Sequence, residues 1–319
     1  VCSSDLVKVI KMNNETIYPE NEWDRESICK YIQDRTEPVI ILGKFPGTGK
    51  SAIGEYFAQM NKNVLFVMPN DRQLQEKLCD GLEATTYNKF FSVAVDEERG
   101  KMPKFDYSPY DVIVFDEVFM LGTFWKNKIR MFNKDNPDKI RILTGDTKQL
   151  PSLEESTNCQ DVEAYAHHRV DVICPYRIFL SVCKRVGAKD SVEGDLNRKL
   201  LDNIFDDWWE HKLPLKDIIP KYFEITDDIM ASEFNIAYTN ERCRNVGNEV
   251  RQRLGKKGKY EIGEVLISKT YMKTPRINQN IRYVIKNIEG GKLSLQNITN
   301  EHDVFSLNVE QVDEIGRAS

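Results

Sequence analysis

The sequence has no excess of basic residues, because 45 Lys and Arg residues stand against 50 Asp and Glu residues and the formal net charge is −5. A basic surface over the whole chain is therefore excluded, and any nucleic-acid binding must be local. The seven cysteines are scattered, with no CxxC pair and no Cys/His spacing typical of zinc. No apolar run reaches the ~20 residues of a membrane-spanning helix. We therefore expect free thiols in a reducing, intracellular compartment and no membrane partner.

The first half of the sequence alternates between short apolar runs and stretches with helical periodicity. The apolar runs are residues 38–43, 64–68, 112–115 and 140–143, and the helical stretches are residues 51–59, 72–79 and 125–132. Strands that alternate with helices predict an α/β fold, in which a parallel sheet is covered by helices on both faces. In such a sheet the carboxyl ends of the strands form the edge that binds ligands.

The second half begins with a different order of elements. A long helical stretch at 197–210 precedes a strand-like run at 234–238 and another helical stretch at 241–254. After the basic run Lys256–Lys259, short strands are separated by turns such as Glu289–Gly291. The strand candidates of this last part are residues 265–268, 281–285, 292–295 and 304–307. This pattern predicts a small all-β module at the end of the chain.

These patterns divide the chain into three parts, which are residues 7–168, 169–256 and 257–313. Residues 1–6 and 314–319 stay outside this division, because they can be back-translated into one short nucleotide string read on opposite strands. That string resembles a common sequencing adaptor. We expect both hexapeptides to be sequencing artefacts and the natural protein to continue past them.

Residues 43–51, with the sequence GKFPGTGKS, follow the first apolar run and open a helical stretch. This context is typical of a phosphate-binding loop, in which glycines turn backbone N–H groups towards a phosphate and the helix N-terminus adds its dipole. We expect Lys50 to reach the β- and γ-phosphates of ATP and Ser51 to hold Mg²⁺. The strict pattern has glycine where this chain has Lys44, and the alternative is an ordinary glycine-rich turn. The expected nucleotide-binding residues are Gly47, Thr48, Gly49, Lys50 and Ser51.

Two adjacent acids end the apolar run of residues 111–117. A buried strand would deliver both carboxylates to the ligand edge of the sheet. There Asp116 is expected to bind Mg²⁺, and Glu117 to orient and deprotonate the attacking water. A pair of surface acids is the alternative, but the strand before them and the loop upstream favour the site.

A third motif occupies residues 143–151, with the sequence LTGDTKQLP. It resembles the third motif of superfamily 1 helicases. With the two preceding motifs, the chain resembles that family over residues 36–300, and the RecD-like, 5′-to-3′ branch is closest. In the family this glutamine senses the γ-phosphate, a role that the resemblance assigns to Gln149. An amide suits the role, because it both donates and accepts hydrogen bonds.

The resemblance implies a RecA-like P-loop domain, a partial second RecA-like domain and an SH3-like β insertion within it. It also implies ATP and Mg²⁺ as cofactors and single-stranded DNA as the partner, with RNA left open. Weaker matches to motifs that face nucleic acid occur at residues 68–70 and 84–87. Their alternatives are a plain turn for the first and a helix cap with a packed aromatic for the second. The implied nucleic-acid contacts are Pro69, Asn70, Thr86 and Tyr87.

The family also has an arginine that reaches the γ-phosphate from the second core domain. Arg185 and Arg177 both stand at the family's spacing from an upstream apolar residue. We assign Arg185, because a helical segment with acidic residues follows it, and a surface arginine is the alternative for either one. Trp23 lies where the family often has an adenine-binding motif, but this stretch does not match that motif.

The family's last motifs, one of which carries an arginine finger, do not occur in these 319 residues. We therefore expect a weakly active piece of a monomeric, ATP-hydrolysing DNA helicase that moves 5′-to-3′ along single-stranded DNA. One alternative is an RNA helicase of the same superfamily. Another is a nucleotide-dependent switch that never unwinds a duplex, which Gln149 and the Leu-Pro after it argue against.

Overall fold

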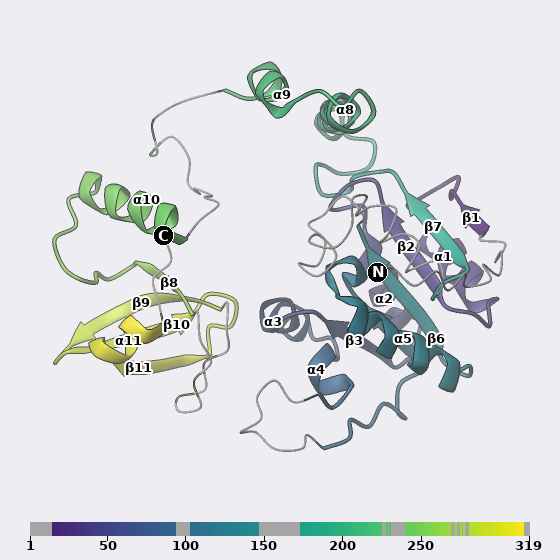
Figure 1. Cartoon of the computed structure of the whole chain (residues 1–319), viewed down its shortest axis with the longest axis horizontal. Helices are drawn as coiled ribbons and strands as arrows, with labels where there is room; N and C mark the ends of the chain where they lie inside the picture. The colour runs from purple at the N-terminus through teal and green to yellow at the C-terminus, as the bar shows by residue number, and fades with distance from the viewer. Residues whose placement is uncertain are drawn as a thin grey trace, which may run out of the picture. The chain divides into compact units, whose positions relative to one another are not determined.

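The structure is a computed structural model, shown in Figure 1. It describes residues 15–93, 103–146, 173–224, 228, 230, 240–268, 272, 275, 277 and 281–315. The strand predicted at 234–238 therefore lies outside the described residues. By internal contacts the chain divides into two compact units, one made of Val1–Asn70 with Gly81–Arg198 and the other of Asp71–Asp80 with Lys199–Ser319.

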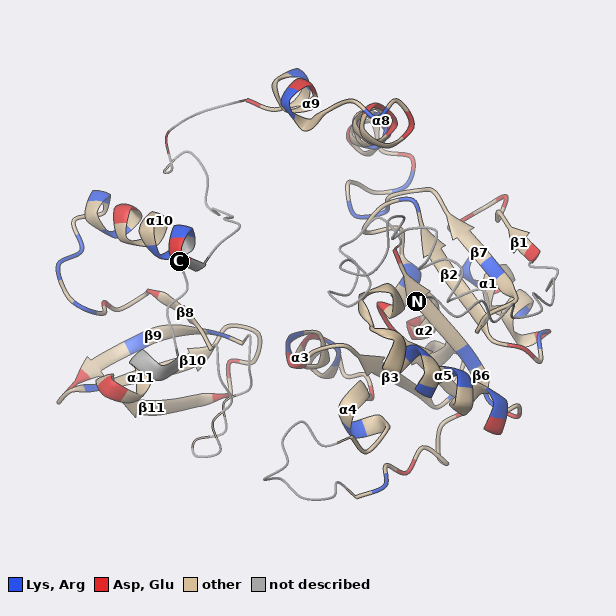
Figure 2. Cartoon of the chain, viewed as in Figure 1, with Lys and Arg blue, Asp and Glu red and all other residues tan. Residues whose placement is uncertain are grey.

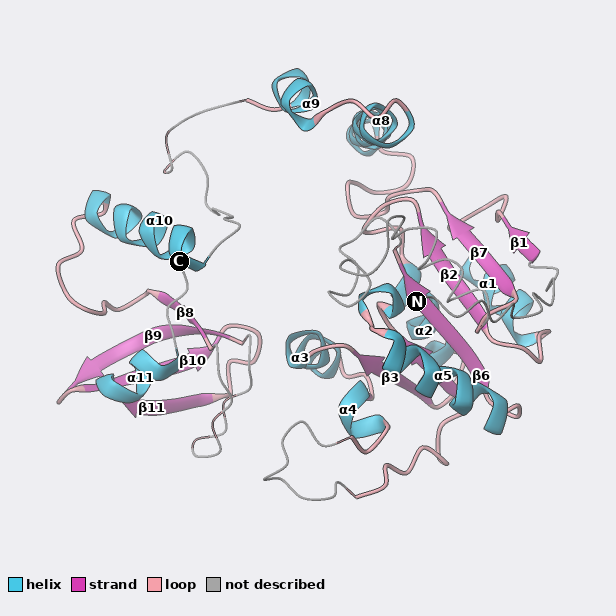
Figure 3. Cartoon of the chain, viewed as in Figure 1, coloured by secondary structure: helices cyan, strands magenta, loops and turns pink. Residues whose placement is uncertain are grey.

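A seven-stranded sheet forms the centre of the first unit, as Figure 3 shows. Its strand order is β1-β7-β2-β6-β5-β3-β4, and every neighbouring pair is parallel. The strands are β1 (Glu15–Ile17), β2 (Val39–Gly43), β3 (Val64–Met68), β4 (Ala84–Thr86), β5 (Val112–Phe115), β6 (Ile140–Gly145) and β7 (Tyr176–Leu180). The predicted α/β fold with a parallel sheet is confirmed.

Helices cover both faces of this sheet. Alternate side chains of a strand point to opposite faces, so Phe66 meets α2 at Gly54 on one face. On the other face Leu65 and Phe115 join a core that includes Phe90 of α4 and Phe132 of α5. The helices of the first unit here are α1 (Arg25–Gln33), α2 (Lys50–Gln59), α4 (Tyr87–Phe90), the 3-10 turn η2 (Val118–Met120) and α5 (Thr123–Asp135). The helix α3 (Asp71–Cys79) follows β3 in the chain and is grouped with the second unit.

The position of β7 corrects the predicted boundary after residue 168. This strand pairs with β2 and β1, with Ile178 opposite both Ile41 and Ile17. The first sheet thus continues at least to Leu180, inside the part that we assigned to a second domain. The sequence did not predict this strand, because Tyr176 and Arg177 interrupt the apolar pattern. In the structure only Ile178 and Leu180 of the strand are fully buried.

In the described part of the chain, four helical segments lie between β7 and the last sheet. They are α8 (Val192–Phe205), the π-helical turn η3 (Asp206–Glu210), α9 (Leu215–Tyr222) and α10 (Asn240–Arg253). The helices predicted at 197–210 and 241–254 are confirmed, although the first begins five residues earlier, at Val192. Among the described residues, no helix is long and apolar enough to span a membrane.

Figure 2 shows that basic and acidic residues alternate along α10. Arg251 pairs with Glu264, whose carboxylate lies in the turn before the last sheet, and Arg253 pairs with Asp228 and Glu249. The basic residues of this helix are therefore partly neutralised by neighbouring acids.

The last part of the chain is a four-stranded antiparallel sheet with the order β11-β10-β9-β8. Gly290 and Gly291 join β9 to β10 with positive φ angles of 55° and 75°, which suit a tight hairpin. The elements are β8 (Val265–Ile267), β9 (Arg282–Glu289), β10 (Lys292–Asn297), β11 (Val304–Asn308) and the helix α11 (Val309–Ile315). The four predicted strands of the all-β module are confirmed.

Candidate nucleotide-binding site

The loop between β2 and α2 has the backbone of an anion-binding loop. Gly47 and Gly49 have φ angles of 84° and 90°, a left-handed region in which side chains other than glycine are strained. Gly49 also caps the N-terminus of α2, so the positive end of the helix dipole faces the loop. Gly43 is needed too, because a Cβ atom there would lie 2.5 Å from the Thr48 hydroxyl oxygen. Gly43 thus makes the close approach, and position 44 can hold lysine.

Two polar side chains of this loop are buried. Lys50 is 7% exposed, and its Nζ atom lies 2.9 Å from where a Cβ atom of Gly43 would be. Thr48 is fully buried, and its hydroxyl oxygen has no hydrogen-bond partner among the described residues. A buried hydroxyl without a partner is costly, so a polar ligand or water at this loop would satisfy it. The donor set therefore fits a phosphate group.

The carboxylate of Asp116 collects two hydroxyl donors at the end of β5. The Ser51 hydroxyl donates to it over 3.2 and 3.4 Å, and the Thr144 hydroxyl of β6 donates to the same carboxylate. Asp116 is only 5% exposed. A serine hydroxyl and a carboxylate are oxygen ligands that suit Mg²⁺, which also takes water and substrate phosphates. Within the described ranges no group of three or more His, Cys, Asp and Glu residues forms a metal cage.

The backbone of Glu117 is in the left-handed region, with φ 53° and ψ 47°. This conformation is uncommon for a residue other than glycine and costs roughly 1–3 kcal/mol, and such residues cluster at functional sites. The Glu117 N–H donates to the Asp116 carboxylate over 3.1 Å. This left-handed conformation turns the chain sharply after β5, and both Asp116 and Glu117 therefore lie at one edge of the sheet.

The buried side chain of Tyr87 stabilises this turn. Its hydroxyl donates to the Asp116 carbonyl oxygen over 2.9 Å, and its ring stacks on Phe115 at a centroid distance of 6.1 Å. Burial, with the charge of Asp116, raises the pKa of the Tyr87 hydroxyl well above its ordinary value, so it remains a donor. Thr86 caps α4 by accepting a hydrogen bond from the Lys89 N–H. For both residues the structure favours the alternative interpretation, a helix cap and a packed aromatic, over nucleic-acid contacts.

Pro69 and Asn70 follow β3 at the carboxyl edge of the sheet, and both are partly buried. Parallel strands bring this edge to the same side as the phosphate loop and Asp116. A nucleic-acid role for the two residues stays a prediction.

Arg185 lies beside the phosphate loop. The chain leaves β7 at Leu180, whose carbonyl accepts from the Lys44 N–H over 2.8 Å, and the Lys184 N–H then donates to the Gly47 carbonyl over 2.8 Å. A Cβ atom on Gly47 would lie 2.7 Å from the Arg185 Cβ and 3.4 Å from its Nε. The prediction that this arginine comes from a second domain is wrong, because β7 belongs to the first sheet.

The competing candidate, Arg177, lies within β7 opposite Ile40 and is partly buried. Burial lowers the pKa of its guanidinium. Its place near the start of the strand, three residues before the strand end, favours Arg185 as the arginine of the site. Gln149 lies outside the described residues, and its role stays a prediction.

Three residues of the site were not singled out from the sequence. Thr144 directly precedes the Gly-Asp pair of the third motif, which was a local signal that it could contribute. Lys184 adjoins Arg185, but nothing in the residue pattern placed its main chain on the loop. Glu22 gave no signal, because its partners lie near residue 181 and include backbone N–H groups.

The first unit has the RecA-like fold of a P-loop NTPase. No protein-family model and no curated protein matches the chain by sequence. Its structure is nevertheless similar to that of Pif1 from Bacteroides bound to single-stranded DNA, with a TM-score of 0.53, 13% identity, and coverage of 91% of this chain and 74% of that one. The complex of Pif1 helicase from Bacteroides with ADP-AlF₃ and single-stranded DNA is similar too. Its TM-score is 0.52 at 13% identity, and the match covers 92% of this chain and 75% of that one.

A third similar structure describes DNA unwinding at forked duplex DNA by two coordinating Pif1 helicases. It has a TM-score of 0.50 and 14% identity, and the match covers 92% of this chain and 76% of that one. At these identities the likeness establishes the fold. The RecA-like α/β fold implied by the three motifs is therefore shown.

Proposed function

We propose that this chain binds ATP with Mg²⁺ and acts as the motor of a superfamily 1 DNA helicase. The observation that carries the proposal is the convergence of the phosphate loop, Asp116 and Thr144 at one edge of a parallel sheet. The site combines a buried lysine, a buried hydroxyl without a hydrogen-bond partner and a serine–aspartate pair. These groups suit a nucleoside triphosphate and its cation. The similarity to Pif1 structures that hold ADP-AlF₃ or single-stranded DNA supports the same assignment.

Each residue then has a chemical task. Lys50 and the loop N–H groups bind the β- and γ-phosphates, while Ser51 and Asp116 hold Mg²⁺, which neutralises charge on the phosphates. Glu117 orients the attacking water and takes its proton. Arg185, next to Gly47, adds positive charge at the γ-phosphate, and Gln149 reports whether that phosphate is present. These roles remain proposals that mutagenesis can check.

The nucleotide part is tested by Lys50→Ala. Binding of a fluorescent ATP analogue, titrated in the presence of Mg²⁺, is expected to weaken by at least about tenfold, because one charge-assisted contact is worth roughly 1.5–3 kcal/mol. The matched control is Lys30→Ala, which removes an exposed lysine of α1. Equal affinity of the wild type and Lys50→Ala would contradict the proposed site.

Hydrolysis by the 319-residue chain is expected to be slow. The sequence contains no match to the family's last motif, and an arginine finger is worth about 10³–10⁵ in rate in related phosphoryl transfers. Steady-state phosphate release should therefore stay low with and without single-stranded DNA. Rapid, DNA-stimulated turnover would show that these residues already form a complete catalytic site.

Because hydrolysis by the 319-residue chain is expected to be slow, unwinding is tested with a longer version that carries the family's last motifs, by strand displacement on partial duplexes with either a 5′ or a 3′ overhang. The proposed 5′-to-3′ movement of a monomer predicts displacement only from the 5′ overhang. ATP hydrolysis without displacement from either substrate would support a nucleotide-dependent switch instead.

A further inference from the structure

Glu22 is a buried acid in the turn that precedes α1. It is 7% exposed. Its Oε1 atom accepts from the Ser181 N–H over 2.6 Å and from the Ser181 hydroxyl over 2.7 Å, and its Oε2 atom accepts from the Val182 N–H over 2.8 Å. A carboxylate is costly to bury unless its oxygens are satisfied, and here three donors from one short segment satisfy them. The N-terminal turn and the segment after β7 are thus joined at a fixed point.

The segment that Glu22 holds leads directly to the phosphate loop. Two residues beyond Val182, the Lys184 N–H donates to the Gly47 carbonyl oxygen over 2.8 Å. The Arg185 Cβ atom then lies so close to Gly47 that a side chain at that glycine would collide with it. Glu22 therefore fixes the start of a five-residue segment, Ser181–Arg185, whose end is Arg185.

The side chain of Lys184 ties the same two segments together a second time. Its Nζ atom donates to the Glu22 carbonyl oxygen and lies 5.4 Å from the centroid of the Trp23 ring. Its alkyl chain runs against Gly49, within 3.3 Å of a Cβ atom built there. Burial lowers the pKa of Lys184, and the charge of Glu22 opposes that shift. The lysine is thus occupied in the frame around the loop, whereas Arg185 is exposed at its rim.

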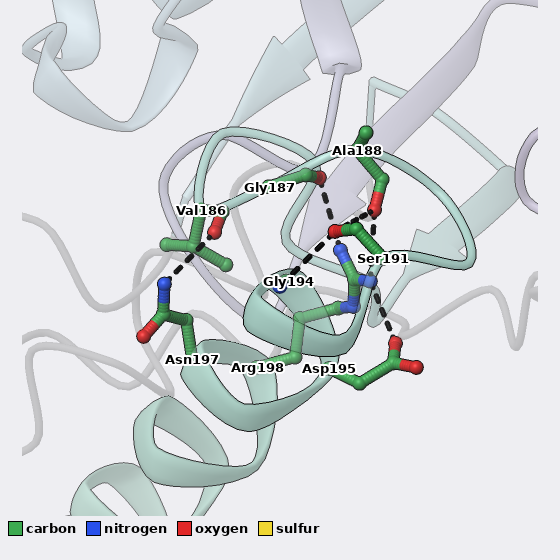
Figure 4. Close-up of polar contacts among 8 residues, drawn as sticks. All are labelled: Val186, Gly187, Ala188, Ser191, Gly194, Asp195, Asn197 and Arg198. Atoms are coloured by element: carbon green, nitrogen blue, oxygen red, sulfur yellow. Dashed lines mark hydrogen bonds and ion pairs between the residues drawn. The ribbon is translucent and has the colours of Figure 1, made fainter.

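The start of α8 fixes the chain on the other side of Arg185, as Figure 4 shows. Arg198 donates to the carbonyl oxygens of Gly187 and Ala188, each over 3.1 Å, and to the Asp195 carboxylate over 2.7 Å. Asn197 donates to the Val186 carbonyl over 3.2 Å. The backbone carrying Arg185 is therefore anchored both before and after that residue.

We propose that Glu22 is a positioning residue of the nucleotide site, which holds the Ser181–Arg185 segment so that the Arg185 guanidinium stands ready at the γ-phosphate end of the phosphate loop. An arginine on an anchored backbone loses less conformational entropy on binding, and its charge is in place before the nucleotide arrives. This inference rests on the proposed function. It assigns to Glu22, whose carboxylate is bound to Ser181 and Val182, an indirect role in specificity. That role is the preference for a triphosphate over a diphosphate.

The test compares the affinities of the 319-residue chain for fluorescent ADP and for a fluorescent, non-hydrolysable ATP analogue, both with Mg²⁺. The variants are Glu22→Gln, Arg185→Gln and the double variant, with Glu20→Gln as a matched control at an exposed acid of the same turn. Glutamine keeps the size of Glu22 but turns an amide donor towards N–H groups. The preference for the ATP analogue should fall by about tenfold in Arg185→Gln, because a lost contact to a charged group has about this effect. Glu22→Gln should show most of the same fall.

The double variant decides whether Glu22 acts through Arg185. If it does, Glu22→Gln adds nothing to Arg185→Gln, because the two residues form one coupled unit. ADP affinity of Glu22→Gln should stay near that of Glu20→Gln, whereas its melting temperature should fall, because buried N–H groups lose an acceptor. If Glu22→Gln does not fold, Ser181→Ala, which removes only the hydroxyl donor, should give a smaller loss of preference in the same direction.

The inference is overturned if Glu22→Gln and Ser181→Ala keep the full preference, if the losses of Glu22→Gln and Arg185→Gln add, or if Glu22→Gln weakens both nucleotides equally. No nucleotide binding by the wild type would instead overturn the proposed function, and this inference with it.

Discussion

A single hydroxyl group connects the aromatic core of the first unit with the acidic end of β5. Tyr87 donates to the carbonyl oxygen of Asp116, and the next residue, Glu117, has a left-handed backbone. Tyr87→Phe keeps the ring and removes this hydrogen bond, so the free energy of unfolding should fall by about 1 kcal/mol. Because the strained turn at Glu117 loses its support, the rate of ATP hydrolysis should fall more than the affinity for ATP.

Chemical denaturation, nucleotide titration and phosphate release check these three quantities. The control is Tyr107→Phe, since Tyr107 lies in the same aromatic cluster, 5.7 Å from Phe90 between ring centroids. A Tyr87→Phe variant that loses stability but keeps the ratio of hydrolysis rate to affinity would limit Tyr87 to a packing role.

At this scale the sequence could identify residues whose chemistry is local, such as Lys50, Ser51 and Asp116, because each stands beside its own strand or glycine pattern. It could not identify Glu22, whose partner Ser181 is 159 residues away. Backbone N–H groups occur at nearly every position, so a carboxylate that binds them leaves no complementary residue type to find. The same reasoning applies to Tyr87, because a buried aromatic donor to a carbonyl looks like any core residue in the sequence.

The buried carboxylate of Asp207 joins two of the helical elements after β7, η3 and α9. Asp207 in η3 accepts from Lys221 over 2.5 Å and from Tyr222 over 2.7 Å, both near the end of α9, and its other oxygen lies 3.3 Å from His211. These hydrogen bonds, the one from Lys221 first, lower the pKa of Asp207 to about 2. The carboxylate therefore fastens α9 to the end of α8 through the π-helical turn.

A lowered carboxyl pKa stabilises the fold at a pH above the unfolded value of ~3.9, and this contribution disappears as the pH falls through the folded value. Asp207→Asn should therefore lower the free energy of unfolding at pH 7, and the difference from the wild type should shrink towards pH 2. Denaturation series at several pH values, with Glu210→Gln at an exposed acid of the same turn as the control, measure this difference. A constant difference across the series would show that the charge of Asp207 is not the cause.

The strands that the sequence predicted are those in the centre of a sheet, where both faces are buried and apolar residues run without interruption, as in β2, β3 and β5. Three strands were missed, and all lie towards the edges of the sheet, β7 and β1 on one side and β4 on the other. In β4 only Thr85 is buried. In β1 only three residues pair, and none of them is fully buried. In β7 only Ile178 and Leu180 are fully buried, so the polar positions hid a strand that carries the chain to Arg185.

At the scale of the whole molecule, the similarity to Pif1 structures covers more than 90% of this chain, so the fold is shared along nearly all of it. With a net charge of −5, any attraction of a polynucleotide must come from local groups, and the carboxyl edge of the sheet is where we expect them. Binding should therefore weaken as salt is raised, with a modest slope that corresponds to few phosphate contacts.

The choice between DNA and RNA is a property of this same surface. A protein separates the two single strands mainly through contacts at the 2′ position, where RNA has a hydroxyl group. We expect fluorescence anisotropy with labelled oligo-dT and oligo-U of equal length to give tighter binding of the DNA, and the ATP analogue to change the DNA affinity. Lys50→Ala should keep the affinity for DNA measured without nucleotide and lose the change caused by the analogue, because that change requires nucleotide in the phosphate loop. Equal or tighter binding of oligo-U, with the same response to the analogue, would make the chain an RNA-directed motor of the same fold.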